Sequence, residues 1–201
     1  MELDEAVRRR RMVRRFDPDA PVPEAVVRDL VALAVRAPSA GFSQGWDFVA
    51  LTDAADRERY WAAASGPGAP DAWLRGVSAA PVLLLCLSDP DAYLDRYAEP
   101  DKGWTDRDPA RWPVPYWDTD TAMAVMLVLL GAVDRGLGAL FFGVPAERHD
   151  EVLAAFDVPA GRRLVGVVAL GHEAERVSGS ARTRRRRGVD EVLHRGRFGV
   201  S

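Results

Sequence analysis

The feature that most limits the fold is a run of six consecutive apolar residues, VLLLCL, at positions 82–87. Pro81 precedes the run and turn-forming residues follow it, so the run is bounded on both sides. Such a run, without polar alternation, is typical of a β-strand that is buried on both faces. Residues 164–170 have the same character. We therefore expect a small sheet whose two faces are both covered by other elements.

The remaining elements follow from the spacing of apolar residues and from glycine and proline breakers. Residues 123–130 are apolar almost all round, so their helix is expected in the centre of the fold or beneath a partner subunit. Asp118 or Asp120 is expected near the N-cap of that helix. Strands are expected at 48–51 and 138–143, and helices at 3–11, from Pro23 to the residues before Pro38, and at 54–64, 71–77, 119–135, 146–156 and 189–193.

The chain shows no internal repeat and no linker, so a single domain is expected over residues 1–201. Helices mixed with a few buried strands indicate the α+β class. The formal net charge of −3 argues against nucleic acid or an anionic membrane as a partner. The longest apolar stretch ends near Val133 and is too short to span a bilayer. With no secretory signal at the start, a cytoplasmic location is expected.

Several kinds of site are disfavoured by the residues present. Cys86 is the one cysteine, so no disulfide can form within the chain, and its apolar strand predicts an inert buried thiol. His149, His172 and His194 lie far apart without ligand spacing, so no metal site is expected. There is no Gly-x-Ser-x-Gly motif of a hydrolase and no Gly-x-Gly-x-x-Gly motif of a dinucleotide-binding fold.

Residues 99–117 form a long segment with four prolines and three tryptophans, at positions 104, 112 and 117. A segment of this length without regular structure is usually functional or mobile. A lid or pocket wall is the favoured interpretation, and a plain surface excursion is the alternative. Its tryptophans indicate that the segment packs on another part of the protein rather than extending into solvent.

Two arginine clusters lie near opposite ends of the chain, which has a single lysine, Lys102. Guanidinium groups bind phosphate oxygens in a bidentate way. Most of the arginines are expected to be solvated, a nucleic-acid patch is disfavoured, and a few could converge on one small phosphate of a nucleotide cofactor. The first cluster holds Arg8, Arg9, Arg10, Arg11, Arg14 and Arg15, and the second holds Arg182, Arg184, Arg185, Arg186 and Arg187.

The first cluster and other segments together resemble the FMN-dependent nitroreductase family, in order and over nearly the whole chain. RRRRMVRRF at 8–16 is similar to the Arg-x-Ser-x-Arg/Lys-x-Phe element, whose alternate residues hold the phosphate and ribityl chain of FMN. Arg10 and Arg14 match its basic positions and Phe16 its aromatic one. Arg11, beside them, is a further candidate for cofactor binding.

The segment APSAGFSQGWDF at 37–48 resembles the family's Pro-Ser-x-x-Asn-x-Gln-Pro-Trp segment, whose backbone reaches the flavin of the partner subunit. Its small residues suit the close approach of something flat. The resemblance makes four of its residues candidates for contact with the cofactor: Pro38, Ser39, Ala40 and Gln44.

Two further segments extend the resemblance. AVDRGLGALFFG at 132–143 is similar to the family's Gly-Leu-Gly strand entry, which implies that Phe142 and Gly143 lie beside the flavin ring. RRRRGVDEVLH at 184–194 resembles the family's C-terminal element, which implies that Arg184 and Arg186 approach the phosphate.

Three positions depart from the family pattern. Met12 stands in place of serine, which removes one hydroxyl contact to the cofactor. Phe42 stands in place of asparagine and makes the pocket more apolar. Gly45 replaces proline. These departures concern the detailed flavin contacts and the substrate class rather than the phosphate anchors.

The resemblance implies a flavin-reductase-like sandwich of the α+β class, with a central, mainly antiparallel sheet flanked by helices. It implies a homodimer with FMN at the interface, and hydride transfer from NAD(P)H through the flavin to a small-molecule acceptor such as a nitroaromatic or a quinone, in a ping-pong cycle. The cofactor carries the redox step, so no catalytic side chain is named. The tryptophans at 104, 112 and 117 either line a pocket for an aromatic acceptor or are ordinary packing residues. The alternatives are a specialised flavin dehydrogenase, a deazaflavin-linked reductase, or a non-catalytic protein that binds flavin or another small molecule.

Overall fold

The computed structural model describes residues 1–66, 68–176 and 184–200. Four strands form one sheet in the order β1-β2-β4-β3, and every neighbouring pair is antiparallel. Their bounds are β1 Trp46–Leu51, β2 Val82–Ser88, β3 Gly138–Phe142 and β4 Arg163–Gly171. The expected antiparallel sheet of the α+β class is therefore confirmed.

Strand β2 lies inside the sheet, between β1 and β4, and every one of its residues is buried. Alternate side chains point to opposite faces, so Leu84 joins one half of the core and Leu83 joins the other. Cys86 is fully buried, and burial raises the pKa of its thiol. The thiol therefore stays protonated, in keeping with the expected role as a small core residue.

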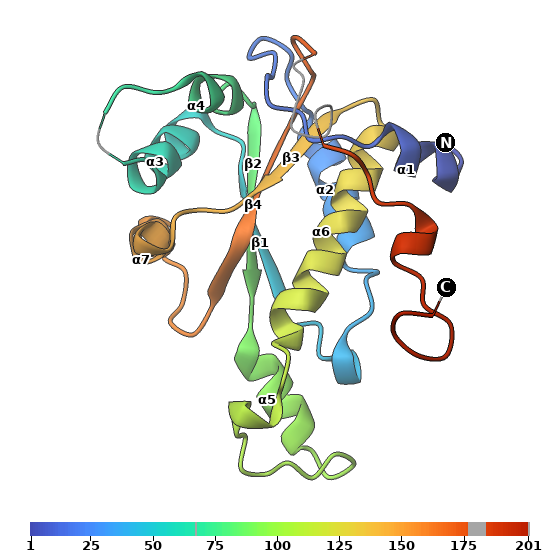
Figure 1. The fold of residues 1–201 in the computed structure, drawn as a ribbon. Helices are drawn as coiled ribbons and strands as arrows, with labels where there is room; N and C mark the ends of the chain where they lie inside the picture. The colour runs from blue at the N-terminus through green and yellow to red at the C-terminus, as the bar shows by residue number, and fades with distance from the viewer. Residues whose placement is uncertain (67, 177–183, 201) are drawn as a thin grey trace.

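Helices cover both faces of the sheet (Figure 1). Helices α2 (Glu24–Ala34) and α6 (Tyr116–Asp134) lie on one face, and α3 (Ala54–Ala64), α4 (Ala72–Val77) and α7 (His149–Ala155) lie on the other. Each face has its own cluster of buried apolar side chains. The run at 82–87 thus lies between two helical layers, as a strand buried on both faces requires.

Helix α6 is the central helix that the sequence predicts. It packs along α2 and contacts all four strands. Gly131 permits this close packing, because a Cβ atom there would lie 2.6 Å from a methyl group of Leu33 and 2.9 Å from one of Leu30. In length and composition α6 is the one helix in the described ranges that could cross a membrane, but half of its most apolar stretch is buried within the fold.

The element boundaries differ from expectation in a few places. Helix α1 (Leu3–Arg9) ends two residues early, and the predicted helix at 146–156 divides into a 3₁₀ turn and α7. Helix α6 starts at Tyr116 after an N-cap at Pro115, so Asp118 lies in its first turn, near the N-cap as predicted, although no aspartate caps the helix. Asp120 instead lies within the helix and is buried. Helix α5 (Pro90–Ala98) was not expected, although Asp89 caps it and Pro90 occupies its first position.

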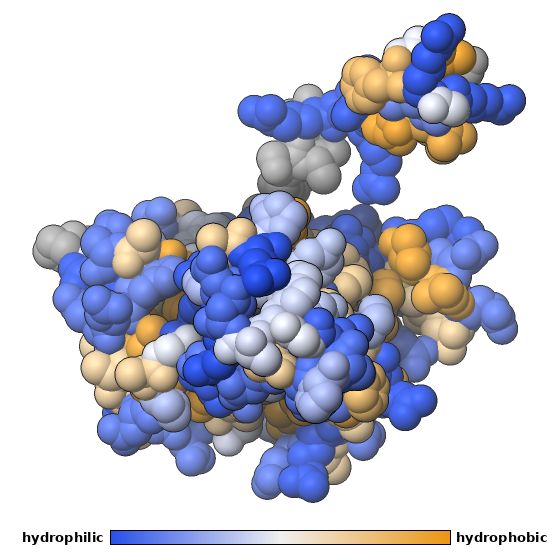
Figure 2. All heavy atoms as spheres, turned by 90° about the horizontal axis from the view of Figure 1, so that it is seen from below, coloured by the Kyte–Doolittle hydropathy of each residue, from blue (hydrophilic) through white to orange (hydrophobic). Residues whose placement is uncertain are grey.

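The two ends of the chain differ in how they are attached. The N-terminal arm, residues 10–16, pairs with the body at Met12, which bridges to Ala139, and at Phe16, which bridges to Glu173. The described part of the tail, residues 184–200, forms hydrogen bonds within itself and is almost wholly exposed. Figure 2 shows this tail as a lobe that stands clear of the body.

Candidate functional site

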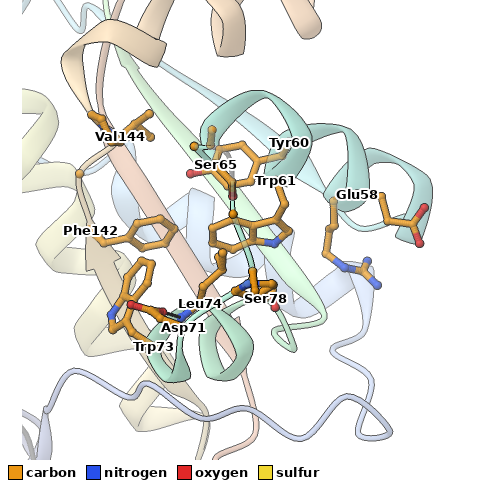
Figure 3. Close-up of a pocket in the computed structure, with 18 of the residues that line it drawn as sticks. Glu58, Tyr60, Trp61, Ser65, Asp71, Trp73, Leu74, Ser78, Phe142 and Val144 are labelled. Atoms are coloured by element: carbon orange, nitrogen blue, oxygen red, sulfur yellow. Dashed lines mark hydrogen bonds between the residues drawn. The ribbon is translucent and has the colours of Figure 1, made fainter.

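Two hollows flank the edge strand β3. The first, here called the α3–α4 cavity, has a volume of about 820 Å³ and lies between helices α3 and α4 and residues 142–145 (Figure 3). The second, here called the arginine pocket, has a volume of about 650 Å³ and lies at the start of β3. Gly138 lines the arginine pocket and Phe142 lines the α3–α4 cavity, so one strand connects the two.

Aromatic rings form a wall of the α3–α4 cavity. The ring of Trp61 stacks on Phe142 with centroids 5.9 Å apart and an angle of 5° between the planes. Trp73 meets Phe142 edge-on at 5.5 Å (Figure 3). Gly143 follows, and a Cβ atom built there would have no neighbour within 4 Å. The cavity therefore offers an apolar surface beside an open stretch of backbone.

The arginine pocket gathers much of the first arginine cluster. Arg8, Arg9, Arg10 and Arg11 line it together with Arg176. Arg11 is engaged by both carboxylate oxygens of Glu173, and this hydrogen-bonded pairing lowers the pKa of Glu173. Arg8, Arg9 and Arg11 form ion pairs, whereas Arg10 forms none with a described residue, so its guanidinium is available for an anion.

Arg14 lies near these residues but lines neither hollow. Its side chain is half-buried and donates a hydrogen bond of 3.1 Å to the carbonyl oxygen of Met12. Its own carbonyl oxygen packs so closely against Gly76 of α4 that a Cβ atom there would overlap it. The arm is therefore fixed between β3 and α4.

The loop at 38–44 lies away from both hollows. Pro38, Ser39, Ala40 and Gln44 do not line either one, and the loop packs beside α5. Ser39 Oγ accepts a hydrogen bond of 3.0 Å from the Gln44 amide. Within one chain the structure therefore does not bring this loop to Phe142.

The tail arginines are also apart from the arginine pocket. Arg184 and Arg186 are exposed and do not line it, and Arg182 lies outside the described residues. The expected site residues thus fall into three groups: those along β3, those in the loop at 38–44, and those in the tail.

The tryptophans of the 99–117 segment pack on one another and on α5. The ring of Trp112 lies 5.5 Å from Trp104, 5.9 Å from Trp117 and 4.5 Å from Tyr97 of α5. None of the three tryptophans lines either hollow. Among the residues that the structure describes, no group of three or more His, Cys, Asp or Glu side chains could hold a metal ion.

The family model described as "Nitroreductase family" matches residues 7–172. The chain belongs to the nitroreductase family. A relative named "NADH dehydrogenase" from Thermus thermophilus is 29% identical over 194 residues, covering 87% of this chain and 88% of that protein. A nitroreductase family protein from Streptococcus pneumoniae has a TM-score of 0.74 at 20% identity, covering 96% of this chain and 99% of the other.

A second solved nitroreductase family protein, from Clostridium difficile 630, also has a TM-score of 0.74, at 16% identity, covering 98% of this chain and all of the other. These structural likenesses show the fold. The expected family and sandwich fold are confirmed, and the chain is an oxidoreductase of this family.

Sequence reasoning missed three parts of the site region. Trp61 and Trp73 were read only as residues of helices, although both line the α3–α4 cavity. Asp120 was considered only as one of two aspartates near a helix N-cap. Its partners, Ala40 and Tyr93, lie 80 and 27 residues away along the chain. No local pattern signals such contacts; only the turn signal at Asp89 and Pro90 could have located the helix that carries Tyr93.

Proposed function

We propose that the chain is an FMN-dependent oxidoreductase that takes hydride from NADH or NADPH and passes it to a small electron-poor acceptor, such as a nitroaromatic or a quinone. The observation that carries this proposal is the edge of β3. It has open backbone at Gly143 at one end and, at the other, Arg10, which forms no ion pair with a described residue. We place the FMN along this edge.

The residues present fit FMN in three respects. Strand β3 spans about 13 Å between its two ends, at about 3.3 Å per residue, which an extended ribityl phosphate can bridge. Apart from the bridge at Ala139, β3 pairs among the described residues only with β4, which would leave its outer backbone groups beyond Ala139 to a polar ring edge. The open space at Gly143 would receive the flat ring.

When bound, FMN supplies the hydride-transfer chemistry, and the protein binds and orients it. Arg10 would hold the phosphate through charge-assisted hydrogen bonds. Backbone N–H groups near Phe142 and Gly143 would stabilise negative charge on the ring as fixed dipoles. The aromatic wall at Trp61 and Trp73 would keep water from one side of the site.

The proposed assembly is a homodimer. Both the loop at 38–44 and the tail carry residues that resemble the family's flavin contacts, yet both lie apart from β3 of their own chain. The tail also exposes apolar side chains, with Val189 70% and Phe198 90% exposed. A second copy would cover these side chains and bring its own loop and tail to the flavin.

The choice of donor is supported by the relative from Thermus thermophilus, whose name includes NADH. Reduced nicotinamide is an intracellular metabolite, so the proposed location is the cytoplasm. The proposed cycle is ping-pong, because one open face of the flavin would serve first the donor and then the acceptor.

The test is the visible spectrum of the purified protein before and after anaerobic addition of NADH or NADPH. We expect a flavin spectrum that bleaches with the donor and recovers when a quinone or nitroaromatic is added. Reduction by another donor alone would favour a specialised flavin enzyme. Bound flavin without turnover would favour a binding protein. A colourless protein that cannot be reconstituted with FMN would contradict the proposal.

A matched pair of variants tests the placement of the flavin. Gly143→Ala adds a methyl group into open space at the end of β3, and Gly66→Ala adds one into open space elsewhere in the lining of the same cavity. Neither should change the free energy of unfolding. Only Gly143→Ala should weaken FMN binding, by about tenfold or more, because its methyl group would displace the ring. Equal FMN affinity in both variants would contradict this placement.

A further inference from the structure

Asp120 is a buried carboxylate that forms no ion pair with a described residue. Its side chain is on α6, and the residue is 2% exposed. One carboxylate oxygen, Oδ2, accepts hydrogen bonds from the Ala40 amide and from the Tyr93 hydroxyl, both at 2.8 Å. Thr119 Oγ1 lies 3.3 Å from the other oxygen. A buried carboxylate is costly unless such donors satisfy it, so its two long-range donors indicate a specific role.

The loop that Asp120 holds is strained. The backbone is left-handed at Phe42, with φ of 58°, and at Gln44, with φ of 52°, although neither is a glycine. Such conformations persist only where the surroundings enforce them, and they cluster at functional sites. The loop presents the ring of Phe42 to solvent, 75% exposed.

Helix α5 provides the second support of this loop. Arg96 Nε donates a hydrogen bond of 2.9 Å to the Gly41 carbonyl oxygen. The Tyr93 ring passes so close to Gly45 that a Cβ atom there would lie 2.6 Å from it, so glycine at this position lets the hydroxyl reach Asp120. Burial, together with the hydrogen bond and charge of Asp120, raises the pKa of Tyr93, so its hydroxyl stays protonated and donates.

We propose that Asp120 is a positioning residue that fixes the loop at 39–44, through the Ala40 amide, in the strained form that presents Phe42 to the flavin site of a second copy. That Asp120 fixes the loop follows from the contacts above. That the loop contacts the flavin site of a second copy rests on the proposed function. A carboxylate that only stabilises the packing of α6 would leave the order of the loop and the affinity for FMN unchanged.

Three variants separate these roles. Asp120→Ala removes the shared acceptor. Asp120→Asn retains one side-chain carbonyl oxygen that can accept hydrogen bonds from both Ala40 and Tyr93, so the loop should stay fixed in this variant. Asp118→Asn is the matched control, because Asp118 bonds Ser88 at 2.6 Å and Arg163 instead of the loop.

The first readout is the hydrogen-exchange rate of the Ala40 amide, measured by NMR on the protein without flavin. We expect exchange at least about tenfold faster in Asp120→Ala, because the amide loses its buried acceptor. Rates close to wild type are expected in Asp120→Asn and Asp118→Asn. If Asp120→Ala fails to fold, Asp120→Leu combined with Tyr93→Phe replaces both side chains by apolar groups of similar shape and leaves the Ala40 amide without an acceptor.

The second readout is the dissociation constant for FMN, with the KM for a quinone acceptor compared against kcat. We expect Asp120→Ala to raise the FMN dissociation constant about tenfold and Asp120→Asn to restore it. Unchanged Ala40 exchange in Asp120→Ala would overturn the proposal. Faster exchange with unchanged FMN affinity would overturn the link to the flavin site. A wild-type protein that binds no FMN would refute the proposed function. The exchange rates of Ala40 alone would then test whether Asp120 fixes the loop.

Discussion

Gly76→Ala is expected to displace the N-terminal arm, residues 10–16. Gly76 lies in α4, and a methyl group there would overlap the carbonyl oxygen of Arg14. The distance would be far below 3.0 Å, the limit under which real Cβ contacts essentially never fall. The obstacle is backbone rather than a flexible side-chain end, so the arm must move by roughly 1 Å. That movement would also break the hydrogen bond of 3.3 Å that the Phe16 amide donates to the Gly76 carbonyl oxygen.

Three contributions set the size of the effect. Overpacking costs about 1–3 kcal/mol. The lost hydrogen bond costs about 1 kcal/mol. Alanine in place of glycine in a helix stabilises the folded state by up to about 1 kcal/mol. The last two offset each other, so Gly76→Ala should lower the free energy of unfolding by about 1–3 kcal/mol.

The assay is urea unfolding of the flavin-free protein, followed by the fluorescence of its six tryptophans. Flavin is left out because a ligand that binds only the native state would add its own stabilisation. With a slope near 2 kcal/mol per molar, the midpoint should fall by about 0.5–1.5 M at unchanged slope. Gly143→Ala is the control and should keep the wild-type midpoint. A wild-type midpoint in Gly76→Ala would refute the close packing of the arm on α4.

Three other perturbations have defined outcomes. Leu30→Ala, at a fully buried position between α2 and α6, should lower the free energy of unfolding by about 2–5 kcal/mol in the same assay. Arg11 lowers the pKa of Glu173, so this pair stabilises the fold above the unfolded carboxyl pKa of about 4.3, and the contribution is lost as pH falls through the lower folded pKa. Urea midpoints between pH 6 and pH 3 should therefore fall less steeply in Arg11→Ala than in wild type, and equal slopes would contradict the pairing. Trp112→Ala should loosen the 99–117 segment, seen as faster proteolysis there, and an unchanged acceptor preference would count against an acceptor pocket lined by these tryptophans.

The inner strands were the most predictable part of the fold. The expected runs at 82–87 and 164–170 match β2 (Val82–Ser88) and β4 (Arg163–Gly171) to within one residue at each end. Burial on both faces demands continuous apolar sequence, and little else produces it. Helix α6 was predictable for the same reason.

Helix α5 was missed because its sequence, PDAYLDRYA, mixes apolar and charged residues over a short span, and only Tyr93 is buried. The helix is amphipathic, but nine residues span fewer than three turns, so its apolar spacing is a short signal in the sequence. The error at Asp120 has another cause. An acidic residue near a predicted helix start favours a cap, and only the fold brings the amide of Ala40 within 2.8 Å of it.

The candidate site shows most clearly what sequence order can establish. The motifs indicated the family because their order and spacing are properties of the chain, but which of their residues meet is a property of the fold. Arg10 and Phe142 line the two hollows at opposite ends of β3. Ser39 and Arg186 match the same set of motifs yet lie apart from that strand. If all four serve one flavin, they cannot all come from one copy in this conformation. The separation of these groups in one chain is therefore the structural argument for a site shared between two copies, and it rests on packing contacts that no motif encodes.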